Sequence, residues 1–261
     1  MAIEITSKDN QAVKAAAKLM ASARERRQTG RFIAEGIRLC TEVLENHCKI
    51  VELFYTEDAY QRYTETVERL ERAAGKSYQI TDEIAEKIAD TVTPQGVFVV
   101  AEMIVNTIDL ATIKTDGQFV LLENLQDPGN VGAIFRTAEA LGLNGAFLTA
   151  DSCDPYNPKA IRASMGAVFR TPVVQTDWAT AQNACADAGI CVAVTALSER
   201  AQDLRQAELD KMAVVIGSEG RGVRKEILEN ARAELIIPMN ERCESLNAAI
   251  AAAIVMWQMR Q

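Results

Sequence analysis

Three loops of this chain carry most of the residue types that could do chemistry. The first is NLQDPGNVGAIFRTAEA, residues 124–140, where an apolar run gives way to a polar turn and then to a helical pattern. Asn130 stands where the N-cap of that helix is expected. Arg136 falls about 140° around the helix from Val131, away from the apolar stripe, at roughly 100° per residue. A strand, a Gly- and Asn-rich loop and a helix with one outward arginine predict a ligand site beyond the carboxyl end of a strand.

The second loop is VVIGSEGRGV, residues 214–223. Gly217, Gly220 and Gly222 allow the backbone to fold tightly and to approach a ligand closely, and the helix that follows offers unpaired N–H groups. The order of these glycines matches neither the dinucleotide-binding fingerprint nor a Walker A loop, so a purely structural turn stays open. Glu219 is either a site residue or an exposed acid with no task.

The third loop is IIPMNERCESLNAA, residues 236–249. Pro238 ends a strand, and Ser245 and Asn247 stand at the start of the last helical pattern. Each of these two residues is either a plain helix cap or part of a site. Three such loops after three strands favour a single site at one edge of a sheet.

The elements that must position these loops alternate along the second half of the chain. The predicted strands cover residues 119–122, 146–149, 191–195, 213–216 and 234–237, and the predicted helices cover 131–141, 178–188, 223–231 and 246–259. This alternation predicts a parallel sheet with helices on both faces. The last helix is apolar nearly all round, so it is buried on more than one side. It is either a core helix only or a core helix that also meets a second subunit.

The first 104 residues form a separate pattern of short helices and strands, typical of a smaller α/β unit. A polar stretch at 105–117 is the expected linker to the second domain, residues 118–261. Five arginines gather between residues 24 and 38 of the first unit, a span that includes a predicted loop and the short strand after it: Arg24, Arg26, Arg27, Arg31 and Arg38. This cluster is either a solvated surface or a patch that contacts RNA phosphates.

Composition bounds the remaining possibilities. The chain has 261 residues, which suits two modest domains, and its net charge of −8 means that any affinity for nucleic acid must come from local clustering. A single histidine, His47, and six cysteines without a C-x-x-C pair argue against a metal site or a disulfide framework, and we expect mostly buried, reduced thiols. With no apolar run long enough for a membrane helix and no signal-peptide pattern, a cytoplasmic protein is expected.

Together the three loops resemble the signature motifs of the SpoU (TrmH-type) family of RNA ribose 2′-O-methyltransferases, part of the SPOUT class. Every position of these motifs is filled: Asn124, Asn130, Gly132, Arg136, Thr137 and Ala138 in the first, Gly217, Glu219, Gly220 and Gly222 in the second, and Ile237, Pro238, Met239, Ser245, Leu246 and Asn247 in the third. RASMGAVFRTPV, residues 162–173, also looks like the family's region between motifs. More loosely, residues 26–45 resemble a ribosomal-protein-like substrate-binding domain.

The resemblance implies a deep trefoil knot, a homodimer with each active site near the subunit boundary, and S-adenosylmethionine as cofactor. The residues that would enclose the cofactor are Thr195, Ala196, Leu197, Gly217, Ile237, Met239 and Leu246. A ribose 2′-hydroxyl would attack the cofactor's methyl group. Arg136 would grip the adjacent phosphate and lower the hydroxyl's pKa by its positive charge. The residues that would orient Arg136 and the ribose are Asn130, Glu219, Ser245 and Asn247.

Large-subunit ribosomal RNA is the favoured substrate because of the first domain, and transfer RNA is the alternative. A protein that keeps the fold as a non-catalytic RNA-binding assembly factor is a rival from another class, although intact motifs argue against it. A nicotinamide-dependent oxidoreductase is disfavoured because no G-x-G-x-x-G follows the first strand.

Overall fold

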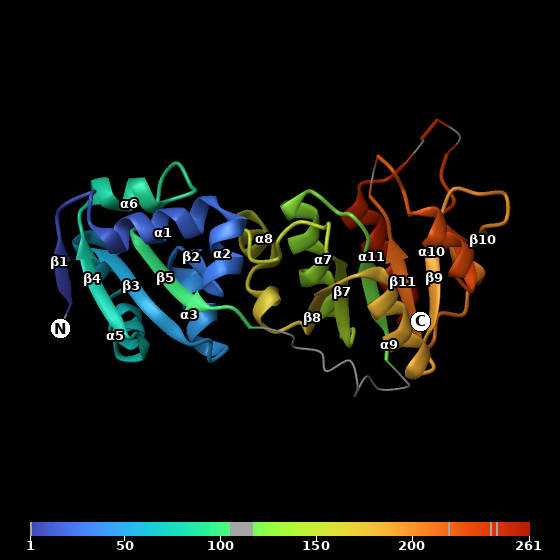
Figure 1. Ribbon diagram of the computed structural model, residues 1–261, viewed down its shortest axis with the longest axis horizontal. Helices are drawn as coiled ribbons and strands as arrows, with labels where there is room; N and C mark the ends of the chain where they lie inside the picture. Colours follow the sequence, from blue (N-terminus) through green and yellow to red (C-terminus); the bar gives the residue numbers. More distant parts are fainter. Residues whose placement is uncertain (1, 105–116, 219, 241, 244) are drawn as a thin grey trace. The chain divides into compact units, whose positions relative to one another are not determined.

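The computed structural model describes residues 2–104, 117–218, 220–240, 242–243 and 245–261. Its internal contacts divide the chain into two units, Met1–Ile104 with Tyr156–Phe169, and Val105–Pro155 with Arg170–Gln261 (Figure 1). Most of the predicted linker, residues 105–116, lies outside the described residues.

The second unit is built on a parallel sheet, as the alternating pattern predicts. Its described strands are β6 (Phe119–Leu122), β7 (Gly145–Thr149), β8 (Val173–Thr176), β9 (Cys191–Thr195), β10 (Gln202–Asp203), β11 (Met212–Ile216) and β12 (Ala233–Ile236). They lie in the order β10-β12-β9-β11-β6-β7-β8, and every neighbouring pair is parallel. The predicted strands differ from these by at most a residue or two at each end, and β8 and β10 were not predicted.

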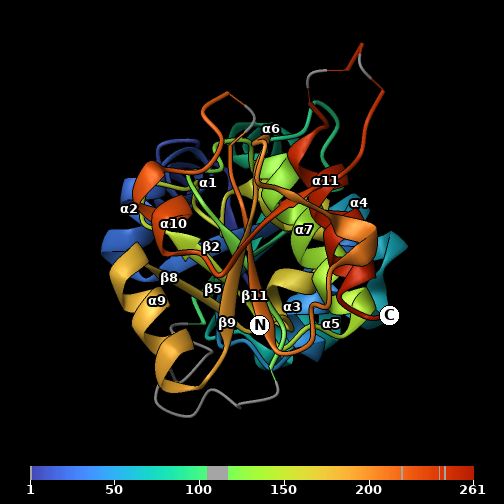
Figure 2. The same ribbon diagram turned by 90° about the vertical axis from the view of Figure 1, so that its right-hand side faces the viewer.

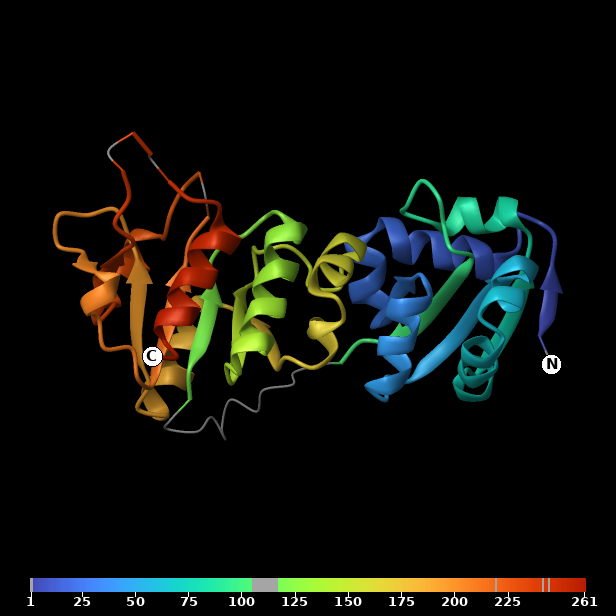
Figure 3. The same ribbon diagram turned by 180° about the vertical axis from the view of Figure 1, so that it is seen from behind.

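Helices cover both faces of this sheet (Figure 2). They are α7 (Pro128–Leu141), α9 (Trp178–Asp187), α10 (Lys225–Asn230) and α11 (Ala248–Gln258), with a short 3-10 helix at Leu204–Gln206. Trp178 and Cys185 of α9 and Ile227 of α10 share one buried cluster with alternate residues of the strands. α7 and α11 lie side by side over the opposite face (Figures 2 and 3).

Helix α7 begins three residues earlier than predicted. Asp127, not Asn130, is its N-cap: Oδ1 of Asp127 accepts hydrogen bonds from the backbone N–H groups of Gly129 at 2.6 Å and Asn130 at 3.1 Å. Pro128 fits the first helical position, where no N–H is needed. The prediction of Asn130 as the N-cap is therefore wrong, and the Asn130 side chain does not cap this helix.

Helix α11 is apolar on nearly all sides, but only one side of it is buried in the described chain. Ala248, Ala252, Val255 and Met256 are buried on one side. Ile250, Ile254 and Trp257, spaced four and three residues apart, are 54%, 38% and 60% exposed. Residues at this spacing share one helix face, so the described chain leaves an apolar stripe of α11 uncovered.

The first unit contains a mixed five-stranded sheet among its described residues, in the order β1-β4-β3-β5-β2. The strands are β1 (Ile3–Ile5), β2 (Arg31–Glu35), β3 (Ile50–Thr56), β4 (Lys76–Ile80) and β5 (Val97–Glu102). The helices are α1 (Gln11–Ala21), α2 (Ala23–Thr29), α3 (Ile37–Glu45), α4 (Glu57–Arg62), α5 (Thr64–Ala73) and α6 (Asp82–Ile88). Helices α1 and α6 pack on one face around a cluster that includes Ile33, Phe54 and Phe98 (Figure 3).

The part of the arginine-rich segment that carries Arg24, Arg26 and Arg27 is the helix α2 and not the predicted loop. Ser22 caps α2 by accepting the N–H of Glu25 at 3.3 Å, and Gly30 ends it in the left-handed conformation at φ 64°. The sequence pattern of the first unit predicts strands at 32–34, 50–55 and 96–103 and a single helix over 60–70. It misses β1, β4 and the break between α4 and α5, because short amphipathic segments carry weak periodicity.

Residues 156–169 pack with the first unit, although the sequence pattern predicts that they belong to the second domain. They contain α8 (Pro158–Ser164) and a 3-10 helix at Ala167–Phe169. The ring of Phe32 lies 5.0 Å from that of Tyr156 and 5.2 Å from that of Phe169, and the Tyr156 hydroxyl donates to the carbonyl of Ile104 at 3.1 Å. Residues 156–169 therefore belong to the first unit, because their aromatic rings pack on Phe32 of β2.

No disulfide joins the six cysteines, all of which the structure describes, and most of them are not buried as predicted. Only Cys40 and Cys185 are buried, Cys243 is exposed, and the other three are half-buried. Within the described part of the chain, no helix combines the length and apolar character needed to cross a bilayer.

Candidate active site

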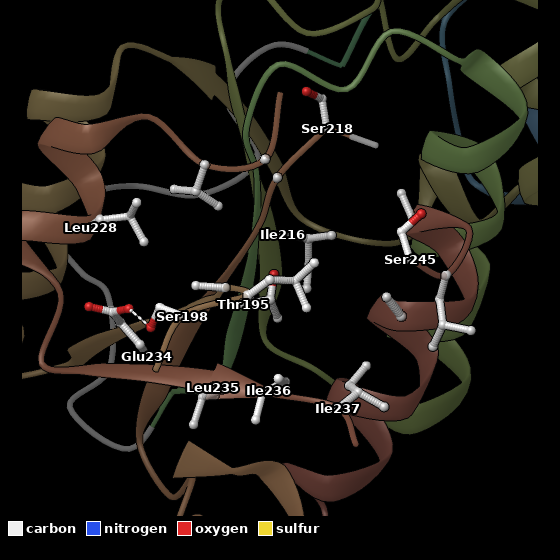
Figure 4. Close-up of a pocket in the computed structure, with 18 of the residues that line it drawn as sticks. Thr195, Ser198, Ile216, Ser218, Leu228, Glu234, Leu235, Ile236, Ile237 and Ser245 are labelled. Carbon is white, nitrogen blue, oxygen red and sulfur yellow. Dashed lines mark hydrogen bonds between the residues drawn. The ribbon is translucent and has the colours of Figure 1, made fainter. Parts of the chain in front are cut away.

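The predicted site residues of the second and third loops meet at the carboxyl ends of β9, β11 and β12. A cavity of about 390 Å³ lies there, and all seven residues assigned to the cofactor line it, together with Ser245. The remaining lining residues are Ser198, Ile216, Ser218, Arg221, Gly222, Val223, Leu228, Glu234, Leu235, Ile236, Ala248 and Ala251. In Figure 4, Ser245 faces the labelled side chains of these strands from the start of α11. The prediction that ligands sit beyond the carboxyl ends of strands agrees with this position.

Glycine at position 217 is required by close packing within the second loop. A Cβ added to Gly217 would lie 2.4 Å from the carbonyl carbon of Gly222. Ser218 and Gly222 exchange two backbone hydrogen bonds, at 3.2 and 2.8 Å, and Gly222 has a left-handed φ of 63°. The loop thus closes on itself beside the cavity, which only a residue without a side chain permits. Glu219 lies outside the described residues.

The third loop is joined to the first by a side-chain hydrogen bond. Nδ2 of Asn247 donates to Oδ1 of Asn130 at 3.0 Å. Asn247, and not Ser245, caps α11: its Oδ1 accepts the N–H groups of Ala249 at 3.0 Å and Ile250 at 3.3 Å. Since the cap fixes which side of the amide carries oxygen, it also turns the NH₂ group of Asn247 toward Asn130. The structure therefore brings these two predicted residues together.

The first loop turns sharply at Asn124, whose φ is 53°. Asparagine tolerates this left-handed conformation better than most residues. Its backbone N–H donates to Oγ1 of Thr149 at 2.9 Å, and its Oδ1 accepts from Nε2 of Gln126 at 2.7 Å. The motif asparagine is thus explained by backbone conformation and local hydrogen bonding.

A buried ion pair between the first and second loops was not predicted. Glu123 ends the apolar run of β6 and is 1% exposed, and its Oε1 accepts from Nε of Arg224 at 2.5 Å. Burial raises the pKa of Glu123, while the charge and hydrogen bond of Arg224 oppose that rise. The available signal was an acid directly after four apolar residues, a place where a carboxylate is seldom left without a partner.

Polar groups also occupy one wall of the cavity. Glu234 accepts a short hydrogen bond from the Ser198 hydroxyl (Figure 4). It also forms an ion pair with Arg200 at 2.6 Å. Arg221, on the second loop, is exposed at the cavity and contributes a positive charge. Neither Glu234 nor Arg221 stood out in the sequence, since isolated charges are common on surfaces.

Arg136 is exposed on α7 and makes no hydrogen bond or ion pair with any residue that the structure describes. It is not among the residues that line the cavity of its own chain. Its guanidinium is available for an outside partner, but the single chain does not join it to the other motif residues.

Four of the five clustered arginines remain available in the first unit. Arg24, Arg27 and Arg38 are exposed and Arg31 is half-buried. Arg26 is 1% exposed, and its Nη1 donates to the carbonyls of Leu19 at 2.7 Å and Met20 at 3.2 Å. The prediction that Arg26 binds RNA is wrong, because this guanidinium is sealed in the core and stabilises the end of α1.

These features define a two-domain α/β protein whose parallel sheet carries a mainly apolar cavity, enclosed by Gly- and Asn-bearing loops at its carboxyl edge. Residues 117–257 match the model of the SpoU rRNA Methylase family, and residues 10–99 match that of the MRM3-like substrate binding domain. The chain belongs to the SpoU rRNA Methylase family.

Relatives match over nearly the whole chain. The chain is 32% identical to the 23S rRNA (guanosine(2553)-2′-O)-methyltransferase RlmP of Bacillus subtilis, over 98% of this chain and 99% of that protein. It is 28% identical to the 23S rRNA (uridine(2479)-2′-O)-methyltransferase of Streptomyces viridochromogenes, over 92% and 86% of the two chains. The crystal structure of an AdoMet-bound rRNA methyltransferase from Sinorhizobium meliloti superposes with a TM-score of 0.89 at 28% identity, covering 99% of this chain and 97% of that one.

Proposed function

We propose that this protein transfers the methyl group of S-adenosylmethionine to a ribose 2′-hydroxyl in large-subunit ribosomal RNA. The observation that carries the proposal is the cavity at β9, β11 and β12, which is lined by every residue assigned to the cofactor from the motifs. Two relatives that match most of their length are named as 2′-O-methyltransferases of 23S ribosomal RNA.

The lining of this cavity fits S-adenosylmethionine. Its volume of about 390 Å³ lies within the range of roughly 300–1,000 Å³ typical of small-molecule sites. Leu197, Ile237 and Leu246 offer apolar walls for an adenine ring, and the loop backbones offer donors and acceptors for its edge. Arg221 and Glu234 supply opposite charges for the carboxylate and the ammonium group. When bound, the cofactor supplies an activated methyl group on a good leaving group.

The chain's own residues then have to orient the ribose and remove its proton. The second unit contains no histidine, the commonest general base. We assign Arg136 to the phosphate beside the target ribose, where its fixed positive charge favours the ionised hydroxyl. Asn130 and Asn247, held together at 3.0 Å, orient the site, with Ser245 and Glu219 in supporting roles.

We further propose that the protein is an isologous homodimer with a knotted C-terminal path. The exposed apolar stripe Ile250, Ile254 and Trp257 on α11 supports the dimer, because a soluble chain rarely leaves such a stripe uncovered. Arg136 does not line the cavity of its own chain. We infer that the second subunit of the dimer brings Arg136 to the cavity. Ribosomal RNA is met in the cytoplasm, where we expect the enzyme to act.

The first unit favours ribosomal over transfer RNA as substrate, since its match is to a substrate-binding domain. Four arginines of the cluster are accessible to contact RNA phosphates in the first unit: Arg24, Arg27, Arg31 and Arg38. The two named relatives modify a guanosine and a uridine, so the target nucleotide of this chain is a separate question.

Two measurements test the proposal. Isothermal titration of the purified protein with S-adenosylmethionine should give saturable binding, and incubation with labelled cofactor and 23S ribosomal RNA should give label in alkali-resistant dinucleotides, the product of 2′-O-methylation. Mapping 2′-O-methyl groups in cells with and without the gene would then identify the nucleotide. Cofactor binding without methyl transfer to either ribosomal or transfer RNA would favour the assembly-factor alternative.

A further inference from the structure

A second cavity lies within the first unit, between α3 and the segment 156–169. Its volume is about 450 Å³, and it is lined by Ile37, Arg38, Leu39, Thr41, Glu42, Arg162 and Met165. Arg162 and Met165 belong to RASMGAVFRTPV, a stretch that the site in the second unit does not use. The cavity is large enough for one nucleotide, judged by the usual size of ligand sites.

Two guanidinium groups and one carboxylate line this cavity. Arg38 is exposed and makes no hydrogen bond or ion pair with any described residue. Arg162 is held on one side only: its Nη2 donates to Asp90 at 2.5 Å, whereas its Nη1 is buried with no partner among the described residues. An unpaired buried donor is unfavourable. Rotation of this guanidinium toward an acceptor in the cavity would remove that cost.

The position of Arg38 in its helix also favours an anionic ligand. Arg38 lies in the first turn of α3, which has no acidic residue there; the N–H of Ile37 donates to the neutral Oε1 of Gln95 at 3.0 Å, so no negative charge offsets that helix end. A cation at the positive end of a helix is destabilising, and an anion beside it reverses the sign of that interaction. The sequence thus places a positive charge where folding alone would favour a negative one.

The rest of the lining is apolar. Ile37 and Leu39 come from α3, and Met165, which is 44% exposed, follows α8. A methionine side chain adapts to flat and irregular partners, so this wall suits the face of a base. A cavity with cationic groups on one side and an apolar wall on the other suits a nucleotide, which joins an anionic phosphate to a flat base.

We propose that this cavity holds one unpaired nucleotide of the RNA, with its phosphate at Arg38 and Arg162 and its base against Ile37, Leu39 and Met165. The inference rests on the proposed function, because it takes RNA as the substrate. Recognition by the first unit then depends on a splayed-out nucleotide in a loop or bulge, which proteins bind far more readily than a base inside an A-form helix.

The test uses the full-length protein and a fluorescent single-stranded RNA 20-mer of random sequence, with affinity measured by anisotropy over a range of salt. Arg38→Ala removes the phosphate contact, and Thr41→Trp fills the cavity without changing charge. Arg72→Ala is the matched control, since Arg72 is an exposed arginine of α5 in the same unit without a described partner. Thermal unfolding of each variant checks that it is folded.

We expect Arg38→Ala and Thr41→Trp to weaken RNA binding about tenfold, with the salt slope of Arg38→Ala reduced by about one ion. Arg72→Ala should stay within about twofold of the wild type. Equal affinities for all four proteins overturn the proposal. So does an Arg72→Ala loss as large as that of Arg38→Ala, which would indicate only general attraction.

Inorganic phosphate separates an RNA site from a site for a free anion. Stabilisation of the wild type by phosphate that is lost in both cavity variants, with RNA affinity unchanged, would mean that a small anion is the occupant and would also overturn the proposal. Titration with S-adenosylmethionine is run on the same preparations. Its failure would refute the proposed function, whereas the RNA measurements report on this cavity alone.

Discussion

Asn247 donates a hydrogen bond to Asn130 at 3.0 Å across a sequence separation of 117 residues. Each asparagine lies in the first turn or cap of a helix, Asn130 in α7 and Asn247 at the start of α11. The bond fixes the two helix ends against each other, next to Leu246 and Ala248, which line the cavity. Two of the three motif loops are therefore positioned by one amide pair.

Substitutions at Asn247 should separate its two tasks. Asn247→Asp keeps the oxygen that caps α11 but loses the NH₂ donor, so its unfolding free energy should stay within about 0.5 kcal/mol of the wild type, whereas Asn247→Ala should lose about 1 kcal/mol. Both variants should lose most methyl transfer, because neither keeps the NH₂ group that donates to Oδ1 of Asn130. Urea unfolding and a methylation assay measure the two effects. Full activity in Asn247→Asp would show that the bridge to Asn130 is dispensable.

Arg136→Ala should abolish methyl transfer while leaving the affinity for S-adenosylmethionine within a few-fold, since Arg136 does not line the cofactor cavity. Stopped-time methylation assays and isothermal titration measure the two quantities. Substantial turnover in this variant would exclude the proposed role.

Mixed dimers extend this test. Subunits carrying Arg136→Ala are combined with subunits carrying Gly217→Asp, whose new side chain would collide with Gly222 and block the cofactor. If each arginine serves the partner's cavity, the mixture should regain activity that neither homodimer has. An inactive mixture, with mixed dimers demonstrated by affinity tags, would mean that Arg136 does not act across the boundary.

Removal of Arg224 should make the free energy of unfolding fall more steeply as pH rises than it does in the wild type. Arg224 lowers the pKa of Glu123 against the effect of burial, so Arg224→Ala raises that pKa further above its unfolded value. A carboxyl with a raised folded pKa contributes stability at low pH that is lost as pH rises through the folded pKa. The variant should therefore fall further below the wild type at about pH 8 than at about pH 5.5, by an amount on the order of 1–3 kcal/mol.

Urea unfolding at the two pH values measures this effect, and the double variant Glu123→Gln with Arg224→Ala is the control. Because glutamine does not titrate, the double variant should lose the extra pH dependence. If Arg224→Ala lowers the free energy of unfolding by the same amount at both pH values, the ionisation of Glu123 does not depend on Arg224.

The exposed stripe on α11 predicts the oligomeric state. Trp257→Glu should convert the proposed dimer to a monomer at micromolar concentration, because a charge would enter its apolar interface. It should also abolish methyl transfer if the subunit boundary completes the active site. Sedimentation velocity gives the mass. Val92→Glu, at a fully exposed valine of the first unit, is the matched control and should leave both the mass and the activity unchanged.

The sequence by itself determined the parallel sheet and, through the resemblance of its motifs, the family and seven of the residues that line the cavity. Period-two and period-3.6 patterns are local, and buried parallel strands such as 119–122 and 213–216 stand out as short apolar runs. The motif residues were identified by their resemblance to the SpoU family's motifs, and the structure shows that two of them, Gly217 and Asn124, meet backbone demands that few residues satisfy.

Only the tertiary structure decided what each polar side chain does. Arg26 and Arg27 are neighbours in sequence, yet one is buried on the carbonyls of α1 and the other is exposed. The bridge from Asn247 to Asn130, the pairing of Glu123 with Arg224 and the docking of residues 156–169 on the first unit all join distant parts of the chain. Periodicity reports which face of an element is apolar, but the partner of a polar group depends on long-range packing, which local pattern does not encode.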